Sequence, residues 1–147
     1  MTGTFEAWTV APGYAANTVL AAQSGVWTHV PNAATTGGST PYHLVSAAST
    51  NATSVKGSAG QVYNYNFLNT NAAIRYVKLF NKASAPTVGT DTPVKTFQVP
   101  ATGQLAGSFP VGSVFATGIA LCTTVSAGDL ASDAVGAGDL IIDLETK

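Results

Sequence analysis

No segment longer than ten residues in this sequence places apolar residues at the spacing of an amphipathic helix. Short apolar runs recur instead, separated by clusters of glycine, proline and small polar residues. Several of these runs alternate between apolar and polar side chains, which is typical of strands that bury one face. Many short strands joined by such turns favour a sandwich or a barrel. The sequence therefore predicts an all-β fold.

The clearest strand signal is the run Gln61–Phe67, which alternates between ring and amide side chains. One predicted face carries the rings of Tyr63, Tyr65 and Phe67, and the other carries the amides of Asn64 and Asn66. A second run, Ile74–Phe80, follows the turn-forming residues 69–71. Its alternation places Arg75, Val77 and Leu79 on one predicted face and Ile74, Tyr76, Lys78 and Phe80 on the other. The two runs together predict a β-hairpin.

The remaining strand signals follow at regular spacing from Tyr42 onward. They predict six more strands: Tyr42–Ala48, Thr53–Lys56, Val94–Val99, Leu105–Phe109, Val114–Val125 and Leu140–Leu144. A loop bracketed by prolines is expected at residues 85–93. With about eight short strands, residues 41–147 are expected to form a jelly-roll-like antiparallel β-sandwich.

Residues 1–40 have a different character, with many Gly, Ala and Thr and few apolar anchors. They predict an extended N-terminal arm with short strands at Phe5–Val10 and Gly25–Val30 and a linker at residues 33–41. Such an arm gains order by adding strands to a neighbour, with aromatic residues as anchors. The interface candidates are Phe5, Trp8, Tyr14, Trp27 and Tyr42. The alternative is that Trp8 and Trp27 fill the core of their own domain.

Charged residues make up only 9% of the chain, against about 25% in ordinary soluble proteins. Two interpretations remain open. Other chains cover much of the surface in an assembly, or uncharged polar side chains solvate it, as in a secreted β-protein. The net charge of −1 provides no positive field for nucleic acid. The uncharged stretch 112–128 is too often interrupted for a membrane-spanning helix, so neither nucleic acid nor membrane is an expected partner.

The few charges are segregated along the sequence. The middle is basic and the C-terminal part is acidic, with Lys56, Arg75, Lys78, Lys82 and Lys95 in the first and Asp129, Asp133, Asp139, Asp143 and Glu145 in the second. Either these groups neighbour each other within one sheet, or the basic face of one subunit meets the acidic face of the next.

No motif predicts catalysis, a metal or a cofactor. His29 and His43 have no further ligand at metal-binding spacing, and Asp91 lies in a proline-bracketed turn. Asp129 and Asp133 offer only two carboxylates towards the six to eight oxygens that calcium takes. The single cysteine, Cys122, is expected to be a buried, inert thiol.

Four stretches of the sequence carry a family resemblance: residues 44–56, 60–63 and 115–120, and most strongly residues 71–94. From Tyr42 to the C-terminus the chain resembles small β-sandwich proteins encoded in the structural gene clusters of tailed bacteriophages. Such domains occur in head decoration (cement) proteins and in tail or fibre proteins. The family has no catalytic residues to carry over.

The resemblance implies a virion structural protein that is made in the host cytoplasm. The favoured version is a capsid decoration protein on the head surface that staples neighbouring capsid subunits. It is expected to be a homo-oligomer, a trimer, whose partner is the major capsid protein or another virion protein. One alternative is a tail fibre or baseplate module. Another is a carbohydrate-binding module with exposed rings on the Tyr63 and Tyr65 face.

Overall fold

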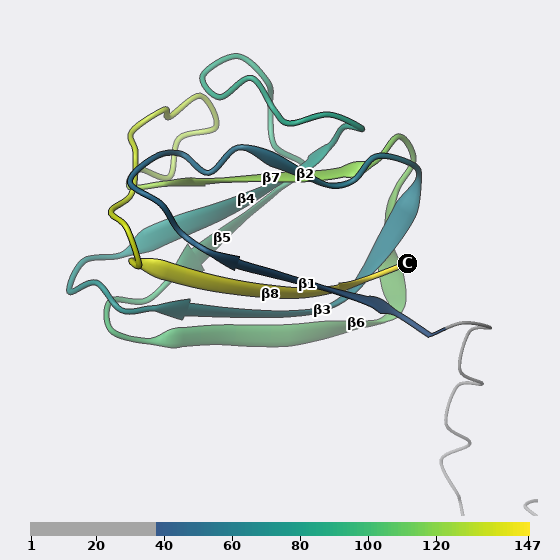
Figure 1. Ribbon diagram of the computed structural model, residues 1–147, viewed down its shortest axis with the longest axis horizontal. Coiled ribbons are helices and arrows are strands. Elements are labelled where there is room, and N and C mark those ends of the chain that lie inside the picture. Colours follow the sequence, from purple (N-terminus) through teal and green to yellow (C-terminus); the bar gives the residue numbers. More distant parts are fainter. Residues whose placement is uncertain (1–37) are drawn as a thin grey trace, which may run out of the picture. The chain divides into compact units, whose positions relative to one another are not determined.

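The structure is a computed structural model that describes residues 38–147, and these residues form eight strands and no helix. The strands are β1 (Thr40–Val45), β2 (Thr53–Lys56), β3 (Gly60–Asn69), β4 (Arg75–Asn81), β5 (Lys95–Val99), β6 (Gln104–Phe115), β7 (Ile119–Thr124) and β8 (Leu140–Thr146). They make two antiparallel four-stranded sheets (Figure 1): sheet A, with the order β1-β8-β3-β6, and sheet B, with the order β2-β7-β4-β5. The all-β prediction is confirmed for this part of the chain, which has no helix able to cross a membrane.

The predicted arm lies almost wholly outside the described residues. Its two predicted strands and four of the interface candidates fall there: Phe5, Trp8, Tyr14 and Trp27. The end of the predicted linker is wrong, because Thr40 and Pro41 already belong to β1. They pair with Thr146 and Glu145 of β8.

The inward faces of the two sheets share one hydrophobic core. Val62 and Ile142 of sheet A and Val77, Leu79 and Leu121 of sheet B are fully buried in it. Burying an aliphatic side chain of this size contributes about 1.5–3 kcal/mol. Val77 and Leu79 face inward with the period of two that a strand requires, but β4 and β7 bury residues on both of their faces, so alternation alone does not mark the core side there.

A cluster of rings joins the sheets at one side of the core. Tyr65 lies with its ring centroid 4.8 Å from that of Phe97 in β5 and 5.6 Å from that of Phe109 in β6. Phe67 is 5.3 Å from both Tyr65 and Phe97. Ring pairs at these separations stabilise beyond their burial alone, so β3 and β6 are fastened to β5 across the layers.

The predicted hairpin of β3 and β4 is wrong, because the two strands lie in different sheets. β3 pairs with β6 and β8, whereas β4 pairs with β5 and β7. Packed sheets are about 10 Å apart, a distance that the link 70–74 is long enough to span. Each strand has a strongly apolar face, and the two faces are buried against each other from opposite layers rather than side by side.

The predicted strand Val114–Val125 is also wrong, since it contains a turn at residues 116–118. Its first part continues the predicted strand Leu105–Phe109 into one long β6, and its second part is β7. Gly118 makes this turn possible. A Cβ there would lie 2.6 Å from the Cα of Ala83, which leaves no room for a side chain.

A bulge changes the predicted ring face of β3. The register of β3 against β6 and β8 shifts between Val62 and Asn64, so alternation does not continue through Tyr63. The Tyr63 hydroxyl bonds to Gln61, whereas Tyr65 packs in the core cluster. The prediction that Tyr63, Tyr65 and Phe67 share one face is therefore wrong for Tyr63.

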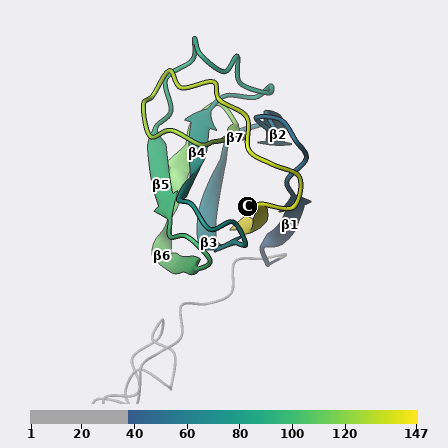
Figure 2. The same ribbon diagram turned by 90° about the vertical axis from the view of Figure 1, so that its left-hand side faces the viewer.

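The outer faces of the two sheets differ. Loops 82–94 and 125–139 lie over the outer side of sheet B (Figure 2). Beneath them Phe80, Ala120 and Cys122 are buried and pack with Val88. The outer face of sheet A has no such cover from residues 38–147, so its outward side chains reach solvent.

Candidate functional site

Outward side chains of three neighbouring strands form a regular array on sheet A. Register places two rows of three residues side by side across β1, β8 and β3: Pro41, Glu145 and Asn64 in one row, and His43, Asp143 and Asn66 in the next. Because facing residues of antiparallel strands have Cβ atoms about 5 Å apart, these six side chains are direct neighbours.

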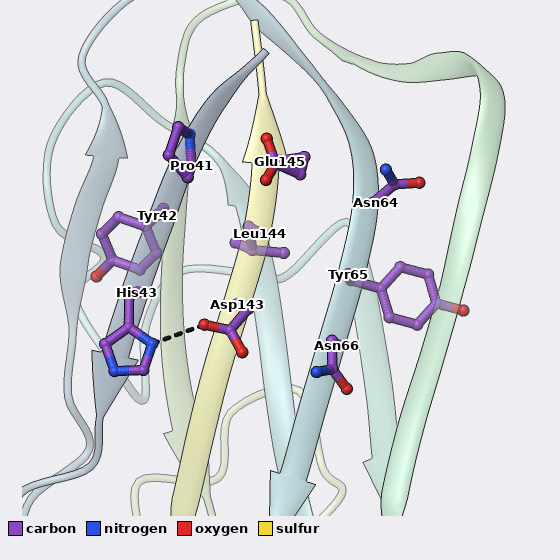
Figure 3. Close-up of a pocket in the computed structure, with 9 residues that line it drawn as sticks. All are labelled: Pro41, Tyr42, His43, Asn64, Tyr65, Asn66, Asp143, Leu144 and Glu145. Atoms are coloured by element: carbon purple, nitrogen blue, oxygen red, sulfur yellow. Dashed lines mark hydrogen bonds and ion pairs between the residues drawn. The ribbon is translucent and has the colours of Figure 1, made fainter.

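The array surrounds an open pocket of about 310 Å³ (Figure 3). Tyr42, Tyr65 and Leu144, which alternate with the outward residues along their strands, complete its lining. The pocket therefore combines two carboxylates, two amides and one imidazole on a rigid sheet surface.

Some of the polar groups already have partners. His43 Nδ1 lies 2.6 Å from Asp143 Oδ1. Ser39 Oγ donates to Glu145 Oε2 at 2.5 Å, and Gln104 Nε2 donates to an oxygen of Asn66. Within residues 38–147, Asp143 Oδ2, Glu145 Oε1 and the Asn64 amide remain available to a ligand.

The charges are divided between the sheets. The strands of sheet A contain Asp143 and Glu145 and no Lys or Arg. The strands of sheet B contain the opposite set, namely Lys56, Arg75, Lys78 and Lys95, and no Asp or Glu. Among the residues of the sheet A strands, only His43 can carry a positive charge beside the two carboxylates, so the pocket favours a cationic group.

The basic middle and the acidic end of the sequence meet within the chain at Arg75 and Asp139. Arg75 Nε donates to Asp139 Oδ2 at 2.8 Å, and both side chains are nearly buried. Burial raises the pKa of the Asp139 carboxyl. Hydrogen bonds from Asn71, Arg75 and the Gly136 N–H lower this pKa by a larger amount, so it lies below the ordinary value. This pair fastens the start of β8 to the start of β4.

Lys78 is a second internal cation. It is fully buried beneath loop 125–139 and donates to the Gly128 carbonyl. Burial raises the pKa of the Asp133 carboxyl. A hydrogen bond from Ser126 and the charge of Lys78 lower it by more, so the pKa of Asp133 lies below its ordinary value. Neither contact is the cross-strand pairing that the sequence suggested, since both acids lie in the loop before β8.

Cys122 on β7 is buried, and it pairs in register with Lys78 of β4. Burial raises the pKa of its thiol to about 11, although the Lys78 charge lowers it somewhat. The prediction of a buried thiol is confirmed.

The other sequence candidates are dispersed. Tyr42, the one interface candidate in the described part, lies half-buried against the core, and burial raises the pKa of its hydroxyl while a hydrogen bond with Thr53 lowers it. Asp91 follows the turn 88–90 and accepts bonds from Lys82 and the Thr87 N–H. Within residues 38–147 no group of three or more His, Cys, Asp or Glu is placed to hold a metal ion.

Sequence reasoning missed the array on sheet A. It assigned His43 no ligand or base role, yet His43 lies against Asp143, one hundred residues away in sequence. The sequence did show that Asp143 and Glu145 are two residues apart and so share one face of their strand. It did not show the register that brings β1 and β3 beside them.

Comparisons of the chain with protein-family models, with curated proteins and with solved structures found no match. The resemblance to phage structural proteins therefore stays a prediction.

Proposed function

We propose that this chain is a structural protein of a tailed-bacteriophage particle, a decoration (cement) protein that self-associates as a trimer on the head surface and staples neighbouring capsid subunits. The role needs no catalytic step. It requires a rigid domain that presents the same contact surfaces many times, so that modest individual affinities act together.

The pairing of the strands carries this proposal. β1 pairs with β8, β2 with β7, β3 with β6 and β4 with β5. This nested pairing is what results when one long antiparallel ribbon wraps into two packed sheets. We infer from it that the domain is a jelly roll, an architecture that recurs in viral capsid domains and in lectins.

The uncharged edge of sheet A further supports a role in assembly. β6 is twelve residues long and contains no charged side chain. Its Val111 and Val114 are 80% and 70% exposed. A free monomer commonly protects such an edge with charges, so an exposed apolar edge fits a surface that other chains cover.

The lectin alternative has less support. It was based on a platform formed by the rings of Tyr63 and Tyr65, and these rings do not share a face. Structural assembly therefore fits the described residues better than sugar stacking does.

Copy number tests the proposal. Particles of the phage that encodes the chain are purified, and the chain is quantified by mass spectrometry against the major capsid protein. Head decoration predicts a copy number of the same order as that of the capsid protein. A few copies per particle would place the chain in the tail instead, and its absence from purified particles would overturn the virion role.

A further inference from the structure

The cations of this chain are almost all engaged by the chain itself. All six Lys and Arg residues lie within residues 38–147. Arg75 pairs with Asp139, Lys82 with Asp91, and Lys78 with the Gly128 carbonyl. The Lys95 ammonium lies 4.9 Å from the centre of the Phe109 ring. Lys147 also has an interaction partner.

Lys56 is the exception among these six cations. Its ammonium has no hydrogen bond or ion pair within residues 38–147. It ends β2 at an edge of sheet B, and its stem runs past Gly60, where a Cβ would lie 2.7 Å from Lys56 Cδ. The absence of a side chain at residue 60 leaves room for this stem.

The pocket on sheet A is complementary to such a group. Glu145 is bonded only to the Ser39 hydroxyl, Asp143 only to His43, and no strand of sheet A supplies a Lys or Arg. The acceptors that line the pocket and have no partner within residues 38–147 are Glu145 Oε1, Asp143 Oδ2 and the Asn64 amide oxygen. Three oxygen acceptors match the three donors of a lysine.

We propose that Lys56 of one copy of this chain enters the pocket between Asp143 and Glu145 of a second copy. This inference rests on the proposed self-association and names the contact responsible for it. Lys56 and the pocket belong to different sheets, so the contact joins two different surfaces. A contact of that kind closes into a ring when its rotation allows, as a trimer requires.

Charge complementarity selects a second copy as the occupant. The acids of sheet A and the unpaired cation of sheet B belong to the same sequence, and within residues 38–147 neither has a fully compensating partner of opposite charge. An ion pair that becomes desolvated between subunits contributes to orientation and to affinity.

A charge-reversal cycle tests the contact. The full-length protein and its variants Lys56→Glu and Glu145→Lys are compared by sedimentation velocity over a range of concentrations. Each single reversal is expected to raise the dissociation constant of the oligomer on the order of 10-fold or more. The double variant, with both reversals, is expected to recover most of the lost affinity, because the pair is restored with opposite signs.

Asp129→Lys is the matched control. Asp129 is exposed, has no partner within residues 38–147 and lies in loop 125–139 over the other sheet. The substitution Asp129→Lys changes the net charge by the same amount as Glu145→Lys and should leave the dissociation constant of the oligomer unchanged. Circular dichroism on every variant confirms that the fold is intact.

Three results would overturn the contact: equal weakening by Asp129→Lys and Glu145→Lys, failure of the double reversal to recover affinity, or a wild-type protein that stays monomeric. The last two leave particle attachment to be measured separately by copy number. A monomer that decorates particles would remove this contact and retain the virion role.

Discussion

At the residue scale, the buried polar side chains stabilise the loops rather than carry out chemistry. Arg75 and Asp139 connect the two sheets, and Lys78 holds loop 125–139 through the Gly128 carbonyl. A buried pair of this kind is costly to break, because the remaining partner keeps its desolvation penalty. Loss of one member of the pair is therefore expected to destabilise the fold by more than the intact pair stabilises it.

Replacing Asp139 tests that role. Asp139→Asn is expected to lower the free energy of unfolding by about 3 kcal/mol at neutral pH, as measured by urea denaturation. Asp129→Asn, at an exposed site that has no partner within residues 38–147, is the control and should change stability by less than about 0.5 kcal/mol. Equal effects of the two substitutions would contradict the assigned role.

The same pair predicts a pH dependence. The pKa of Asp139 is lower in the folded chain than its ordinary value. Its contribution to stability is therefore fully present above the unfolded-state pKa of about 3.9 and is lost as the pH falls through the folded-state pKa. The stability difference between wild type and Asp139→Asn should shrink on acidification from pH 7 to about pH 2.5. A difference that stays constant over this range would exclude the ionised carboxylate as its source.

Cys122 supplies a second test at this scale. With the pKa of its thiol raised to about 11, the thiolate fraction at pH 8 is on the order of 100-fold smaller than for an ordinary cysteine. A thiol-specific chromogenic reagent should label the native protein very slowly and the urea-denatured protein completely. Rapid stoichiometric labelling of the native protein would contradict the burial.

At the scale of elements, the turn between β6 and β7 depends on Gly118. A Cβ there would lie 2.6 Å from the Cα of Ala83 and 2.8 Å from the carbonyl oxygens of Lys56 and Lys82. Gly118→Ala is expected to cost about 1–3 kcal/mol, because the backbone atoms around it must move.

Gly128→Ala is the matched control for this turn. No atom lies within 4 Å of a Cβ built at residue 128, so the substitution should leave the unfolding free energy within about 0.5 kcal/mol. Thermal or urea unfolding of both variants measures the comparison. Similar stability of the two variants would show that the turn relaxes around an added methyl group.

The strands were largely predictable because each element has a local pattern. β2 begins and ends as predicted, and the core-facing residues of β4 are those that alternation selects. Bulges and sheet membership were not predictable. The shift at Tyr63 and the crossing of residues 70–74 between layers depend on partners far away in sequence. The array of His43, Asp143 and the asparagines of β3 was hidden for the same reason.

At the scale of the whole molecule, the two sheets carry opposite charge and unequal cover. Sheet B carries the strand cations, of which Lys78 is buried beneath loop 125–139, whereas sheet A presents two carboxylates and an uncharged edge to solvent. This division of charge is the basis of the proposed contact between copies. In that proposal, a chain with few charges still forms an electrostatic contact, because its acids and its unpaired cation lie on different sheets.

The N-terminal segment has its own predicted outcome. Removal of residues 1–38 leaves β1 intact, since that strand begins at Thr40. The shortened protein should still fold, with a β-strand circular dichroism signal and cooperative unfolding, because the core involves residues from β1 to β8. Attachment to the particle should be lost, as measured by co-sedimentation with undecorated heads. Undiminished attachment would contradict the role assigned to the arm.

The central claim, that this chain is a self-associating structural subunit, is tested most directly by the mass of the full-length protein in solution, measured by multi-angle light scattering at low salt. We expect a stable trimer, whose mass falls when about 1 M salt screens the charges between subunits. A monodisperse monomer at the same protein concentration would contradict the claim.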